Sequence, residues 1–93
     1  MRKYVIERTV PGAGGMTNAQ LAELAAASNQ VLHEMGPDIQ WIESQVVDDR
    51  IYCVYAAADE DLIKEHARRG GFPIDSVHRV EATIDPTTAE LVR

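Results

Sequence analysis

The stretch "IYCVYAAADEDLIKEHARRGGFP", from Ile51 to Pro73, carries the pattern that decides the fold. Its first part, residues 51–57, is short and rich in β-branched and aromatic residues, which predicts a β-strand. The part that follows predicts a helix, with Asp59 as N-cap and a glycine pair at residues 70–71 as the stop signal. A strand that leads directly into a helix is one half of a split βαβ motif.

The residues before this stretch repeat the alternation of strand and helix. "KYVIERT" (residues 3–9) predicts a first strand, and the Pro11–Gly15 run after it predicts a flexible loop. "TNAQLAELAAASNQVLHEMG" predicts a helix, because Thr17 and Gln20 have capping-box spacing and a Gly-Pro pair ends the run. Alanines make this helix slim, so we expect it to lie close to the sheet.

Two further strands complete the predicted fold. "IQWIESQVVD" (residues 39–48) and the strand at 51–57 flank a hairpin turn, and "SVHRVEATID" (residues 76–85) predicts the last strand. The order β-α-β-β-α-β predicts an α+β, ferredoxin-like fold. In that fold a four-stranded antiparallel sheet has the order 4-1-3-2, and both helices cover one face. We expect one domain over residues 1–93, with residues 86–93 as a C-terminal tail.

Composition excludes several classes of function. The 93 residues are 45% hydrophobic, which argues against a disordered chain. Fifteen acidic against nine basic side chains give a net charge of −6, which disfavours binding to nucleic acid or to an anionic membrane. No apolar run reaches transmembrane length. The one cysteine cannot form an intrachain disulfide, so we expect a cytoplasmic protein.

Strand alternation predicts which side chains face the helices. For the first and last strands the predicted inward residues are Tyr4, Ile6, Val80, Ala82 and Ile84. For the middle strands they are Ile42, Ser44, Val46, Tyr52, Val54 and Ala56. This phase puts Cys53 on the open face, whereas the helical stripe of residues 62–70 turns His66 toward the sheet. The backbone layer would then separate the two side chains.

The strand at residues 51–57 is apolar on both faces, so its open face needs a cover. We therefore expect a homodimer that packs sheet against sheet. A cavity on that face would be lined by Glu7, Glu43, Cys53, Tyr55, Arg79 and Glu81.

Several stretches together resemble a known family. They are "YVIERT", "WIESQV", "YCVYAA" followed by "DEDLIKEHARRGGFP", and "DPTTAE", which span Lys3 to about Glu90. They resemble an uncharacterised family of small, mostly bacterial, ferredoxin-like proteins that includes an actinobacterial nickel-binding dimer. The resemblance implies the same fold, a homodimer and nickel as a cofactor. The Pro11–Gly15 loop is longer than the first connector usual in that family.

The candidate metal ligands are His66, Cys53, Glu7 and His78, because imidazole, thiolate and carboxylate together suit nickel. No short metal-binding motif joins them. Each also has a plain structural explanation. His66 would be a buried histidine hydrogen-bonded to Ser44 or Tyr52, and Cys53 a small buried hydrophobe. Glu7 would form a structural salt bridge across the dimer, with Arg79 as the candidate partner.

The sequence therefore supports a homodimeric protein that binds a divalent metal, with nickel as the first choice. The alternative is a cofactor-free small-molecule enzyme, or a ligand-binding protein, that uses the cavity on the sheet face. A third possibility is an interaction module without a site. No nucleophile–base motif singles out a reaction, so no catalytic residue is assigned.

Overall fold

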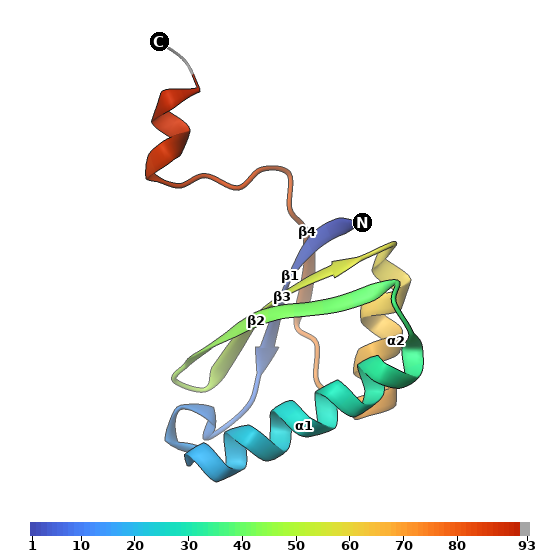
Figure 1. The fold of residues 1–93 in the computed structure, drawn as a ribbon. Coiled ribbons are helices and arrows are strands. Elements are labelled where there is room, and N and C mark those ends of the chain that lie inside the picture. The colour runs from blue at the N-terminus through green and yellow to red at the C-terminus, as the bar shows by residue number, and fades with distance from the viewer. Residues whose placement is uncertain (92–93) are drawn as a thin grey trace.

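The structure is a computed structural model and describes residues 1–91. In chain order its main elements are β1 (Arg2–Thr9), α1 (Asn18–Met35), β2 (Ile39–Val47), β3 (Arg50–Ala57), α2 (Glu60–Gly70) and β4 (Ser76–Arg79). The strands form one antiparallel sheet in the order β2-β3-β1-β4, with both helices on one face (Figure 1). This confirms the predicted α+β, ferredoxin-like fold and the strand order 4-1-3-2. Neither helix combines the length and the apolar composition needed to cross a membrane.

Both helices begin and end at the residues that their caps predict. The Thr17 hydroxyl accepts a hydrogen bond from the Gln20 backbone N–H, and the Gln20 side chain accepts one from the Thr17 N–H. This reciprocal capping box starts α1. The Asp59 carboxylate accepts from the Leu62 N–H at the start of α2, and Gly71 ends that helix with a left-handed backbone (φ 69°).

The register between β1 and β3 decides which side chains lie under the helices. Ile6 is paired with Cys53, and Tyr4 with Tyr55, so these partners share a face. All four are buried, with at most 4% of their surface exposed. The predicted phase of β3 is therefore wrong. The inward residues are Ile51, Cys53, Tyr55 and Ala57, whereas Tyr52, Val54 and Ala56 lie on the open face.

A β-bulge changes the phase of β2. The register shifts between Trp41 and Glu43, so Ile42 has no cross-strand partner and is 50% exposed. Trp41 pairs with Tyr55 and therefore lies on the helix side, opposite to the prediction. Beyond the bulge, Ser44 pairs with Cys53 on the helix side, as predicted.

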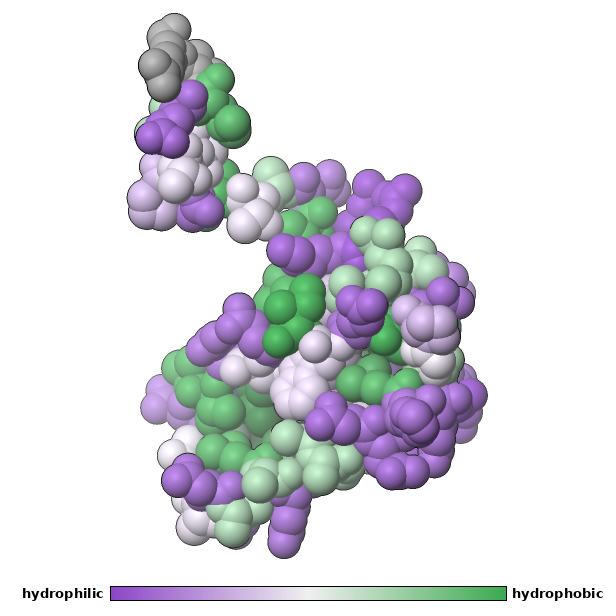
Figure 2. Space-filling model, viewed as in Figure 1, coloured by the Kyte–Doolittle hydropathy of each residue, from purple (hydrophilic) through white to green (hydrophobic). Residues whose placement is uncertain are grey.

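The last strand is shorter than predicted, and its phase is reversed. It ends at Arg79, which pairs with Tyr4 on the helix side, whereas His78 pairs with Val5 on the open face. The predicted inward positions Val80, Ala82 and Ile84 all follow the end of the strand. The Val80 N–H still donates to the Lys3 carbonyl oxygen, and the chain up to residue 91 then leaves the sheet and stands clear of it (Figures 1 and 2).

The predicted flexible loop at Pro11–Gly15 is held against the β2–β3 turn. Its middle forms a 3₁₀ helix (Ala13–Gly15), and Ala13 is 1% exposed. The Gly14 N–H donates to the Asp48 carbonyl oxygen at 2.6 Å, and the Val10 N–H donates to the Asp49 carbonyl oxygen at 2.8 Å. These hydrogen bonds hold the loop in place, although its glycine content predicts a flexible loop.

Replacing Gly14 by alanine tests this attachment. The new Cβ would lie 2.9 Å from the Asp48 carbonyl oxygen, so the loop has to move away from the turn. We expect the free energy of unfolding to fall by about 1–3 kcal/mol, measured by urea denaturation. Gly15→Ala is the control, because no atom lies within 4 Å of its new Cβ. Equal stabilities of the two variants would contradict the attachment.

Candidate functional site

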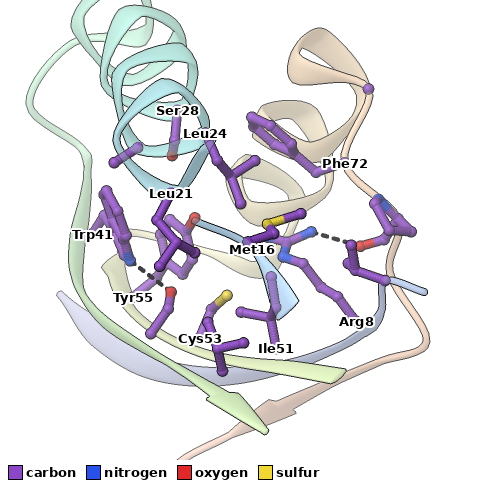
Figure 3. A pocket seen from close by; sticks show the side chains of 16 residues that line it. Arg8, Met16, Leu21, Leu24, Ser28, Trp41, Ile51, Cys53, Tyr55 and Phe72 are labelled. Atoms are coloured by element: carbon purple, nitrogen blue, oxygen red, sulfur yellow. Dashed lines mark hydrogen bonds between the residues drawn. The ribbon is translucent and has the colours of Figure 1, made fainter. Parts of the chain in front are cut away.

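A cavity of about 450 Å³ lies between α1 and the helix-facing side of the sheet (Figure 3). It exists because α1 does not pack closely on the sheet. Along this 18-residue helix only Ser28 is buried, and Leu21, Leu24 and Ala25 in its first half are half-buried and line the cavity. The expectation that α1 lies close to the sheet is therefore wrong for that half.

The walls of the cavity are mostly apolar, with a few polar side chains from the sheet and from α1. These polar residues are Arg8, Ser28, Ser44, Cys53 and Tyr55. The indole N–H of Trp41 donates to the Ser44 hydroxyl at 2.9 Å, which satisfies both side chains within the wall. An apolar cavity with few polar groups is the usual form of a small-molecule site.

Arg8 is the unusual residue of this site. It is only 5% exposed, and its Nη1 donates to the Pro73 carbonyl oxygen at 2.7 Å. The guanidinium lies over the ring of Phe72, 5.8 Å from its centroid. Its Nη2 is buried and has no hydrogen-bond partner in residues 1–91, where no carboxylate oxygen lies within 4.0 Å of Arg8.

Arg8 was not among the residues predicted for any site. The signal was nevertheless present, because Arg8 has the same strand parity as Tyr4 and Ile6, which were predicted to face the helices. A charged residue at an inward position of a central strand marks a buried charge that needs a partner.

A buried aromatic cluster lies behind the cavity. His66 is 0% exposed, and its Nε2 lies 3.2 Å from the Ser28 hydroxyl. Its ring packs between Tyr55 and Phe72, with centroid distances of 5.3 and 5.2 Å. The structural explanation of His66 as a buried, hydrogen-bonded histidine is confirmed. Its partner is Ser28 on α1, and the two predicted partners, Ser44 and Tyr52, make no such contact.

Burial and the charge of Arg8 set the protonation of this cluster. Burial, together with the positive charge of Arg8, lowers the pKa of His66 from 6.5 to about 4, although contact with the Ser28 backbone opposes both effects. His66 is therefore neutral at pH 7. Burial raises the pKa of Tyr55 and outweighs the nearby guanidinium of Arg8, which lowers it, so the phenol stays protonated.

The lowered pKa of His66 makes stability depend on pH. Below pH 6.5 His66 is protonated in the unfolded chain, whereas in the folded chain it stays neutral down to about pH 4. The free energy of unfolding therefore falls as the pH falls from 6.5 to about 4. Between pH 7.5 and 5 we expect a loss of about 2 kcal/mol, measured by urea denaturation.

His66→Gln should remove most of this dependence, whereas the exposed His33→Gln control should keep it. The interpretation fails if the wild-type chain and His66→Gln lose the same stability over that range.

The open face of the sheet carries a second group of polar residues. Glu7 Oε1 forms an ion pair with Arg50 on the same chain, and Oε2 accepts a hydrogen bond of 3.5 Å from the Ser76 hydroxyl. Glu7 thus has a salt bridge, but it lies within one chain and its partner is Arg50, whereas the prediction was a salt bridge across the dimer. Arg79 lies on the other face and is not the partner.

The four predicted metal ligands fall into two separate groups. Glu7 and His78 lie on the open face, whereas Cys53 and His66 lie on the helix side. Cys53 and His66 are therefore on the same side of the sheet, contrary to the predicted separation. Within residues 1–91, no three side chains of the types His, Cys, Asp and Glu gather closely enough to hold one metal ion.

The predicted cavity on the sheet face also divides. Glu7 and Glu43 are on the open face, but Cys53 and Tyr55 line the cavity under α1. Arg79 is on the helix side of β4, and Glu81 follows the end of that strand. The phase of β3 differs by one residue from the prediction, and this places Cys53 and Tyr55 under the helices while Glu7 and Glu43 stay on the open face.

Comparison with known proteins gives a family and a fold. The profile of a family described as nickel responsive protein SCO4226-like matches residues 4–80. The crystal structure of SCO4226 from Streptomyces coelicolor A3(2) matches with a TM-score of 0.73 and 19% sequence identity. That match covers 88% of this chain and 99% of the other, and at this identity it shows the shared fold. No curated protein matches the chain.

Proposed function

We propose that this chain, which belongs to the SCO4226-like family of nickel responsive proteins, is a homodimer that binds nickel. The observation that carries the proposal is the family match over residues 4–80. The open face of the sheet supports the proposal, because it carries Glu7 and His78 as possible donors.

One chain by itself does not supply a full set of ligands. Glu7 on β1 and His78 on β4 lie on the open face at diagonal positions of neighbouring strands, where side chains can approach one another. Oε1 of Glu7 pairs with Arg50, so Oε2, which accepts only a long hydrogen bond from Ser76, is the oxygen better placed to bind a metal. Two copies related by a two-fold axis would together offer two imidazoles and two carboxylates, a donor set that suits Ni(II).

The open face also supports the proposed dimer. Its centre is formed by half-buried side chains that no helix covers, which are Val5, Tyr52, Val54 and Ala56. An apolar sheet face of this kind is stabilised when a second sheet packs on it. A second copy offers the same surface, so the interface would be self-complementary.

Titration of the metal-free protein with Ni(II) by calorimetry tests nickel binding. We expect binding at micromolar concentration and at least roughly tenfold weaker binding by His78→Ala, because an imidazole ligand is lost. His33→Ala is the matched control, since His33 is an exposed histidine on α1. Absence of heat with the wild-type protein, or equal losses in both variants, would refute the proposed site.

Light scattering after size-exclusion chromatography tests the dimer. The wild-type protein should have twice the chain mass of 10.3 kDa. Val54→Lys should give a monomer, because it places a charge in the centre of the apolar face. Ala22→Lys, at an exposed position of α1, should remain dimeric. A monomeric wild-type protein would remove the premise that two chains share the metal.

A further inference from the structure

The cavity under α1 carries an inference that does not depend on nickel. We propose that it binds a small hydrophobic carboxylic acid as its anion. The carboxylate would be held by Arg8, and the apolar part would lie among Leu21, Leu24 and Ile51. Nothing in the proposed metal function uses this cavity or this arginine.

Arg8 is a buried cation without a counter-charge among the described residues. A guanidinium remains charged at any physiological pH, and burying a charge without a counter-charge is costly. The groups beside Arg8 are the Pro73 carbonyl oxygen, the ring of Phe72 and the protonated phenol of Tyr55, and none of them carries a full negative charge. Arg8 lines the cavity, and its Nη2 is buried without a hydrogen-bond partner in residues 1–91. The described residues therefore supply no counter-charge to this guanidinium.

The rest of the cavity wall is uncharged and mostly apolar. Arg8 is the only charged residue among the described residues that line the cavity, so no acidic side chain competes with a bound anion. In Figure 3 the side chains of Leu21, Leu24 and Ile51 lie around the same space as Arg8. A volume of about 450 Å³ is within the usual range for small-molecule sites.

Charge and polarity together select the class of ligand. A single cation matches a monoanion, and a carboxylate accepts hydrogen bonds in the geometry that a guanidinium offers. A phosphate dianion would bring a second charge into an apolar wall that has no second cation. A neutral apolar molecule would fill the volume but would leave the guanidinium of Arg8 without a counter-charge.

The fluorescence of Trp41 provides a direct measurement. Trp41 is the only tryptophan in the chain, and it lines the cavity. Sodium decanoate, below its micelle concentration and with EDTA present, should change the emission in a saturable way. Decanol should bind roughly 10- to 100-fold more weakly, because a charge-assisted hydrogen bond to Arg8 is missing. Inorganic phosphate should not bind.

Two pairs of variants locate the binding. Arg8→Met should bring the affinity for decanoate down to that for decanol, whereas Arg79→Met, an exposed arginine of the same sheet face, should not change the preference. Ala25→Phe fills the cavity and should weaken the binding of both probes at least roughly tenfold. Ala26→Phe is the control, because Ala26 is exposed on the same helix.

The comparison of decanoate with decanol on the wild-type protein needs no variant, so it stands even if Arg8→Met does not fold. Equal binding of the two probes, or no binding of decanoate, would overturn the proposal. A folded Arg8→Met chain that still prefers decanoate would overturn it as well. Because EDTA is present, failure here leaves the nickel proposal unaffected, and failure of nickel binding leaves this proposal unaffected.

Discussion

The antiparallel pairing of β1 with β3 is the constraint on which the rest of the structure depends. Ile6 lies opposite Cys53, and this single register assigns every side chain of the two central strands to one face or the other. It brings Arg8, Cys53 and Tyr55 under the helices, and it leaves Glu7 on the open face. A shift by one residue would exchange the two groups and would remove both proposed sites.

The two helices use the inner face differently. Helix α2 packs closely, because Ile63, His66 and Ala67 are all buried. The first half of α1 instead lines the cavity, and unfilled volume beneath a helix lowers stability. A domain of this size has a small stability margin. A ligand that binds only the folded chain would add to that margin by mass action.

The end of α2 shows how local backbone chemistry shapes the cavity. A Cβ at Gly70 would overlap the ring of Phe72, so the absence of a side chain there lets that ring lie against the last turn of the helix. Phe72 in turn lies against both His66 and the Arg8 guanidinium. The glycine pair that ends α2 therefore also positions one wall of the cavity.

The sequence by itself determined the elements, their caps and their order. Thr17, Gln20 and Asp59 act within a few residues of themselves, so their roles are readable without knowledge of the rest of the chain. The alternation of strands and helices then restricts the topology to very few choices. The helical stripe also showed correctly that His66 is buried.

Only the tertiary structure decided the faces of the strands, and with them the sites. Both faces of β3 are apolar, so hydrophobic alternation could not distinguish the correct phase from its opposite, and a bulge at Ile42 reverses the phase within β2. Arg8 was visible as an inward charge, but its lack of a counter-ion depends on which distant residues pack against it. Pro73 and Phe72 are brought to Arg8 by the fold alone, and no local pattern encodes that contact.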